Sequence, residues 1–102
     1  MVKHIVLWKL KEAAGGKTKA ENASIIKELL ERLPAKIQAL KSAEVGINIL
    51  PEDNDMVCDV VLTAICETQE DVEVYAVHPE HQKVVSFIKK VVSERRVIDY
   101  QY

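Results

Sequence analysis

Two stretches of the chain, residues 2–10 and 56–66, carry apolar side chains at both odd and even positions. Alternate side chains of a β-strand point to opposite faces of the sheet, so a strand with this pattern is apolar on both faces. In the first stretch, one face presents Ile5 and Leu7, and the other carries His4, Val6, Trp8 and Leu10. The pattern predicts two central strands covered from both sides, the second of them interrupted by Asp59.

The segment between these two stretches predicts a helix and an outer strand. Residues 17–33 have a helical period, and their apolar stripe consists of Ala23, Ile26, Leu29, Leu30 and Leu33. Pro34 ends this helix and can begin a short helical turn that extends to Leu40. Residues 45–50 alternate Val and Ile with Gly and Asn, which indicates a half-buried strand.

The C-terminal part of the chain predicts two consecutive helical stretches and a last strand. Thr68, with Asp71 three residues later, suits the N-cap of a helix that extends to about residue 77. Residues 79–93 continue helically, with Val84, Phe87, Ile88, Val91 and Val92 on one face. Residues 97–102 predict the closing strand.

The element order is therefore β-α-β-β-α-β, which predicts a ferredoxin-like α+β fold with an antiparallel sheet. In this fold the helices cover only one face of the sheet, although the two central strands are apolar on both. An uncovered second face would expose more apolar surface than a monomer usually does. We therefore expect a second copy of the chain on that face, in a two-fold homodimer.

Composition and charge restrict the class of protein. The 102 residues form one domain, residues 1–102, with 48% hydrophobic and 29% charged residues and a net charge of -2. This charge gives no electrostatic basis for binding nucleic acid or a membrane surface. Cys58 and Cys66 lie in one extended stretch, roughly 26 Å apart and too distant for a disulfide. Free thiols and the lack of a leader pattern or a long apolar run favour a cytoplasmic protein.

The segment Tyr75-Ala-Val-His78-Pro79-Glu-His81 carries the candidate chemistry. Proline is well placed in the first turn of a helix, so we expect His78 at the helix entrance and His81 in the first turn. The positive end of the helix dipole disfavours a charged imidazole there, and a neutral imidazole can accept a proton. Tyr75 shares a helix face with Val72, so its ring should be buried and its hydroxyl needs a partner.

The same residues also raise the question of a metal site. His78 and His81 have an i,i+3 spacing, and Asp59 or Asp99 could supply oxygen ligands. No third ligand stands at a diagnostic spacing, and the proline leaves the directions of the two imidazole rings open. We therefore expect neither a metal nor a cofactor.

Three segments of the chain are distinctive: Val-Lys-His-Ile-Val-Leu-Trp-Lys at 2–9, Tyr-x-x-His-Pro-x-His at 75–81 and Arg-Val-Ile-Asp-Tyr at 96–100. Together they resemble the stress-responsive A/B barrel domain (Dabb) family of the dimeric α/β-barrel superfamily. The resemblance implies a ferredoxin-like subunit whose sheet pairs with a partner sheet to enclose a barrel. Most members have no established activity. One plant member is a cofactor-free polyketide cyclase, whose catalytic tyrosine and histidine match Tyr75 and His81 and whose first-strand histidine matches His4.

Two functions remain open from the sequence. The first is a stress-related homodimer without catalysis, which either binds a small apolar molecule in the barrel or simply resists unfolding. The second is a cofactor-free cyclase or lyase acting on a small carbonyl compound. In it His81 is the general base, Tyr75 donates a hydrogen bond to the enolate, and substrate contacts come from His4, Trp8 and His78. Each residue also has a structural alternative: His4 and Trp8 as core residues, Tyr75 as a tie across the helix break, His78 as an N-cap and His81 bonded to backbone.

Overall fold

The computed structural model describes all of residues 1–102 and has a four-stranded antiparallel sheet in the order β4-β5-β1-β6. The strands are β1 (Val2–Leu10), β4 (Ser42–Ile47), β5 (Val60–Cys66) and β6 (Val92–Gln101). The two strands with apolar residues at both parities, β1 and β5, are the central pair. The ferredoxin-like fold predicted from the element order is confirmed.

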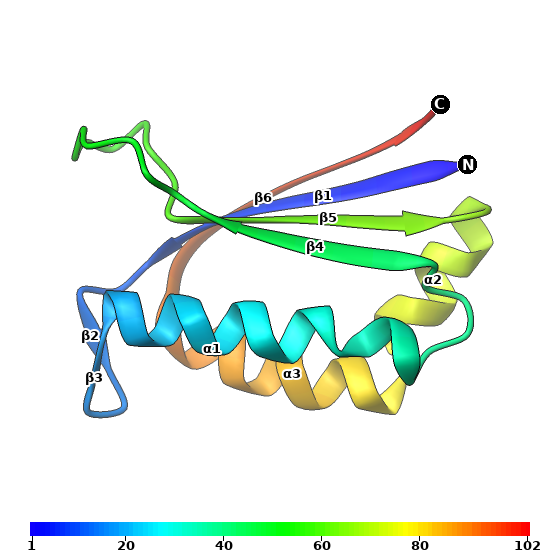
Figure 1. The fold of residues 1–102 in the computed structure, drawn as a ribbon, viewed down its shortest axis with the longest axis horizontal. Coiled ribbons are helices and arrows are strands. Elements are labelled where there is room, and N and C mark those ends of the chain that lie inside the picture. The colour runs from blue at the N-terminus through cyan, green and yellow to red at the C-terminus, as the bar shows by residue number, and fades with distance from the viewer.

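The helices α1 (Lys19–Glu31), α2 (Gln69–Val77) and α3 (Pro79–Val91) all lie on one side of the sheet (Figure 1). A short 3-10 turn, η1 (Leu33–Ala35), follows α1 at Pro34, as expected. None of the helices combines the length and the apolar character needed to cross a membrane. The even-numbered side chains of β1 face the helices. Val6 is buried opposite Leu62 of β5 and belongs to the same hydrophobic core as Ile26 and Leu30 of α1.

The start of α1 differs from the prediction because a small hairpin precedes it. This hairpin pairs β2 (Ala13–Ala14) with β3 (Lys17–Thr18), and Gly15 and Gly16 turn it with φ of 61° and 76°. Such positive φ values favour glycine. Thr18 then caps the helix: its hydroxyl accepts from the Glu21 N–H, and the Glu21 carboxylate accepts from the Thr18 N–H. The helix therefore begins at Lys19, not at residue 17.

Three strands also differ from the prediction in their bounds. Strand β4 spans Ser42–Ile47 instead of residues 45–50, because its pairing with β5 runs from Ser42 opposite Ile65 to Ile47 opposite Val60. Strand β5 starts at Val60 instead of residue 56, because Asp59 closes the end of the sheet: its carboxylate accepts from the Leu10 N–H at 2.7 Å and lies 3.5 Å from Lys19 Nζ. Strand β6 starts at Val92 instead of residue 97. Its first half is polar and carries little strand signal, but it pairs with β1 as an edge strand.

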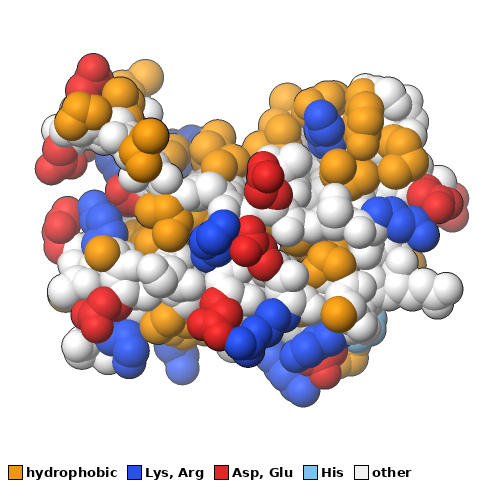
Figure 2. All heavy atoms as spheres, in the orientation of Figure 1, with side chains coloured by type: hydrophobic (Ala, Val, Ile, Leu, Met, Phe, Trp, Pro, Cys, Tyr) orange, Lys and Arg blue, Asp and Glu red, His pale blue; other side chains and the backbone are white.

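The side of the sheet opposite the helices is uncovered (Figure 1). We call it the open face; its uncharged members on β1, β5 and β6, identified from the strand register, are Ile5, Leu7, Val61, Thr63, Ile65, Ile98 and Tyr100, and charged residues such as Arg96 lie among them. Ile5 stands at its centre between Thr63 and Ile98, and 58% of the Ile98 surface is exposed. Figure 2 shows hydrophobic side chains gathered along this upper side, around a hollow between a projecting loop and the chain termini.

The projecting loop, residues 48–59, joins β4 to β5 and rises away from the helices (Figure 1). Its apolar residues Ile49 and Met56 are 96% and 90% exposed. Cys58 in this loop and Cys66 at the end of β5 are both free thiols, as their spacing predicted.

Candidate functional site

A cavity of about 330 Å³ lies between the sheet and the helices, beside the junction of α2 and α3. Most of its walls are hydrophobic, and side chains from β1, β6, α2 and α3 supply its polar groups: His4, Trp8, Tyr75, His81, Lys89 and Arg95. Four of the five residues proposed from the sequence therefore meet in one place. A ligand bound by them would lie on the helix side of the sheet, not between two facing sheets as the barrel interpretation expected.

The break between α2 and α3 positions His81. Pro79 occupies the first turn of α3, and His78 caps it by accepting a hydrogen bond from the Glu80 N–H at its Nδ1, 3.1 Å away. His81 Nδ1 donates to the Ala76 carbonyl at 2.8 Å, since a carbonyl oxygen can only accept. The backbone bond expected from the structural alternative is thus present.

This backbone bond also defines which nitrogen of His81 is basic. Burial lowers the pKa of His81 below its ordinary value of 6.5; the bond to Ala76 opposes this, and the charge of Arg95 adds to the lowering. The imidazole is therefore neutral at neutral pH. Because Nδ1 carries the proton, Nε2 holds the free lone pair and can act as a base.

Tyr75 lies against both histidines. Only 1% of its surface is exposed, its ring centroid is 4.2 Å from that of His81, and it is 6.0 Å from His4 in an edge-on arrangement. Burial raises the pKa of Tyr75 well above its ordinary value of 10.0, so the phenol keeps its proton and remains a donor. His4 hydrogen-bonds to Asp99 and His81 to the Ala76 carbonyl. Neither histidine forms a hydrogen bond with the Tyr75 hydroxyl.

A hydrogen-bond chain orients His4. Its Nδ1 donates to one Asp99 oxygen at 2.5 Å, and the Gln69 amide donates to the other at 2.9 Å. Burial alone would raise the pKa of Asp99, but these two hydrogen bonds lower it below 3.8, so the carboxylate is charged at neutral pH. This arrangement fixes the ring of His4 beside Tyr75.

Trp8 contributes an unpaired donor to the same cavity. The indole is 4% exposed, and its Nε1–H has no hydrogen-bond partner in the protein. Buried indole N–H groups usually have a partner, so this group is available to a ligand oxygen. Trp8 is also directly opposite Arg95 in the pairing of β1 with β6.

The family follows from a comparison with known domains. The family model described as "Stress Responsive A/B Barrel Domain" matches residues 2–102. The chain belongs to this family. Among curated proteins, none matches the sequence.

Solved structures agree with this family membership. A dimeric protein of unknown function with a ferredoxin-like fold from Bacteroides fragilis is 34% identical, with 99% of this chain and 95% of that one covered and a TM-score of 0.87. A dimeric ferredoxin-like protein of unknown function from Thermobifida fusca is 19% identical over 99% and 90% of the two chains, with a TM-score of 0.80. A hydroxynitrile lyase from Passiflora edulis is 16% identical over 97% and 90%, with a TM-score of 0.78. The last two share the fold, and no reaction follows from them.

His78 is the exception among the residues predicted for the site. It does not line the cavity, and its ring nitrogen is engaged in capping α3. We therefore leave it out of the binding site and assign it the N-cap role. No group of three or more His, Cys, Asp or Glu side chains is placed to hold a metal ion.

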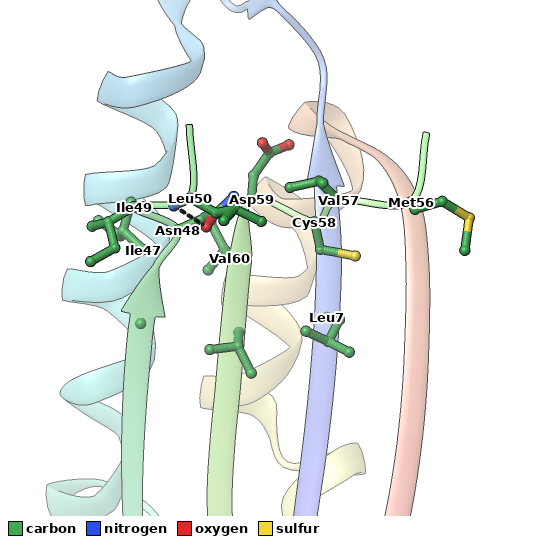
Figure 3. Close-up of a pocket in the computed structure, with 12 residues that line it drawn as sticks. Leu7, Ile47, Asn48, Ile49, Leu50, Met56, Val57, Cys58, Asp59 and Val60 are labelled. Carbon is green, nitrogen blue, oxygen red and sulfur yellow. Dashed lines mark hydrogen bonds between the residues drawn. The ribbon is translucent and has the colours of Figure 1, made fainter. Parts of the chain in front are cut away.

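A second hollow, of about 470 Å³, lies on the opposite side of the sheet (Figure 3). It is bounded by Leu7 of the open face and by apolar residues of the projecting loop, including Ile49 and Met56. The Asn48 side chain accepts from the Leu50 N–H at 2.7 Å and shapes the start of this loop. Neither Tyr75 nor any histidine reaches this hollow. It belongs to the open face and not to the site.

Several members of the site were not found from the sequence. The sequence suggests Asp99 only as an oxygen ligand and as part of the segment 96–100, and it does not indicate Gln69, Lys89 or Arg95. Asp99 and Arg95 reach the site because β6 pairs with β1 in a register that sets them opposite His4 and Trp8. The sequence shows that Asp99 and Arg95 lie on the same face of a strand, because their numbers differ by four. It does not show which residues of β1 they pair with.

We expect acid to destabilise the protein partly through His81. Well above pH 6.5 this residue is neutral in both the folded and the unfolded chain and adds no pH dependence. Below that value the unfolded chain takes up a proton first, because burial lowers the pKa only in the folded state, and unfolding is favoured. Urea denaturation from about pH 7.5 to about pH 5.5, at one protein concentration, should show stability falling more steeply for the wild type than for His81→Gln. Equal slopes would contradict the assignment of a buried, neutral His81.

Proposed function

We propose that the protein is a homodimer in which each subunit binds a small, largely apolar molecule between the sheet and the helices. The observation that supports this is the cavity of about 330 Å³ in which His4, Trp8, Tyr75 and His81 converge. Ligand sites typically begin at about 300 Å³ and combine apolar walls with a few polar groups. The cavity meets both conditions.

The polar groups favour a ligand that carries oxygen. The Trp8 N–H and the Tyr75 hydroxyl are donors without a histidine or backbone partner, and His81 Nε2 is an acceptor. Val6, Leu62 and other apolar side chains form the rest of the wall. An aliphatic ketone, alcohol or related compound fits this combination.

The homodimer part of the proposal rests on the open face. A sheet face on which Leu7 and Ile98 are exposed to water and Ile5 is only half-buried is costly, and a second copy would cover it. The proteins from Bacteroides fragilis and Thermobifida fusca that share the fold are described as dimeric. The apolar tip of the projecting loop, with Ile49 and Met56, extends this face and would gain cover in the same contact.

Trp8 makes the binding proposal measurable, since it is the single tryptophan of the chain and lines the cavity. Titration with nonan-2-one, and with its shorter and longer homologues, should change tryptophan fluorescence and give a calorimetric binding isotherm. Val85→Phe adds volume to the cavity wall and should weaken binding by about tenfold or more. Val77→Phe is the matched control, because Val77 is exposed and does not line the cavity. The absence of binding by every homologue, or equal binding by Val85→Phe, would contradict the proposal.

A second candidate function is cofactor-free catalysis on a carbonyl compound. It is favoured by the 4.2 Å contact between the Tyr75 and His81 rings, which sets a protonated phenol beside a neutral imidazole. His81 Nε2 would remove a proton from the carbon next to the carbonyl, and the Tyr75 hydroxyl would donate to the enolate oxygen. His4, fixed by Asp99, would position the substrate. A hydroxynitrile lyase shares the fold, but this candidate rests on the residues of the present chain.

A further inference from the structure

Two cationic side chains at the cavity have no role in the proposal so far. Arg95 lies on the helix-facing side of β6, opposite Trp8, and Lys89 lies in the last turn of α3. Both line the cavity. The charge of Arg95 also acts on the site. Burial is the largest cause of the raised pKa of Tyr75 and of the lowered pKa of His81, and the positive charge of Arg95 lowers both pKa values.

Neither cation is neutralised by the protein. No ion pair of the chain includes Lys89 or Arg95. No acidic residue lines the cavity. Glu94 adjoins Arg95 in the sequence, but it points to the opposite side of β6, where it pairs with Arg96. On the side of β6 that carries Arg95, the nearest carboxylate is that of Asp99, four residues away and therefore about 13 Å along the strand. Both of its oxygens are already engaged by His4 and Gln69.

We propose that the ligand of this cavity is a small apolar carboxylic acid whose carboxylate binds Arg95 and Lys89 while its apolar chain enters the cavity. This inference rests on the proposed function and names the chemical class of its ligand. A guanidinium presents two parallel N–H donors that match the two oxygens of a carboxylate, and the lysine ammonium adds a point charge. The hydrophobic walls exclude a ligand that is polar along its whole length.

The polar groups deeper in the cavity suit an acid with a second oxygen. With the carboxylate at Arg95, the unpaired Trp8 N–H directly across the strand pair lies next along the ligand. The Tyr75 hydroxyl and His81 Nε2 then stand farther along β1, toward His4. The arrangement favours oxo or hydroxy acids over simple fatty acids.

The test compares nonanoate with nonanamide, which have the same chain and nearly the same shape but differ in charge. Calorimetric titration of the wild-type protein should show nonanoate binding about tenfold tighter or more, the effect typical of a charge-assisted hydrogen bond. Arg95→Gln and Lys89→Gln should each remove most of this preference and leave nonanamide binding unchanged.

The chain supplies a matched control for each variant. Arg96→Gln removes the same charge one residue along β6, but on the open face, and Lys90→Gln does so one residue along α3, outside the cavity wall. Both should keep the preference for the acid. Equal binding of nonanoate and nonanamide, or an equal loss in the control variants, would overturn this inference while leaving the proposed function intact. Binding of neither compound would count against the proposed function itself. A preference for inorganic phosphate over nonanoate would also overturn the assignment of a carboxylate.

Discussion

Ile5→Glu will separate the two subunits while leaving each subunit folded. Ile5 lies at the centre of the open face, between Thr63 and Ile98, so two-fold symmetry would bring two new carboxylates into a buried apolar contact. Burying an unpaired charge costs several kcal/mol, and about 4 kcal/mol corresponds to an increase of about a thousandfold in the dissociation constant. In the separated subunit the same side chain points into water, so the fold is retained.

Light scattering and sedimentation velocity at low micromolar concentration provide the measurement. The wild type should have the mass of two chains and Ile5→Glu the mass of one, with matching circular dichroism spectra. Val74→Glu is the control, since Val74 is an exposed residue of α2 on the helix side of the molecule, and it should remain dimeric. A dimeric Ile5→Glu protein would show that the open face is not the contact.

The fold could be predicted from the sequence wherever the spacing of apolar residues distinguishes a helix from a strand and one face of a strand from the other. Apolar residues at both parities identified β1 and β5 as central strands, because only a strand between two neighbours in a covered sheet tolerates that pattern. The hairpin of residues 13–18 was not predicted, because its strands have only two residues each. The first half of β6 was not predicted either, because Glu94, Arg95 and Arg96 suggest a solvated loop, although pairing with β1 makes them a strand.

The site was predictable only in part, for a related reason. Pro79 and the spacing of Tyr75, His78 and His81 are local features, and local rules placed His78 at the cap and His81 in the first turn of α3. The partner of His4 depends instead on the register between the first and the last strand of the sheet, ninety-five positions apart in the chain. No local pattern encodes that register. The same pairing places Arg95 at the cavity, so the charge of the site became visible only in the folded chain.

If the second candidate function is correct, the protein will exchange the hydrogens next to the carbonyl of nonan-2-one for deuterium in heavy water. This exchange needs a base near the carbon and a donor near the oxygen, which are the roles of His81 Nε2 and the Tyr75 hydroxyl. His81→Ala should slow the exchange by about 10²–10⁴-fold. Tyr75→Phe removes one donor to the enolate oxygen and should slow it by about 10²–10³-fold. Proton NMR follows the loss of signal directly.

His78→Asn is the control, because it removes a histidine from the same segment without removing the proposed base His81. Asparagine is a good N-cap, so the variant should keep α3 in place, and His78 lies outside the cavity. Its exchange rate should equal that of the wild type. A wild-type rate no faster than buffer, or a His81→Ala rate equal to the wild type, would exclude this catalysis. In that case Tyr75 and His81 would serve only to bind, because a base that transfers no proton contributes its hydrogen bond and its shape alone.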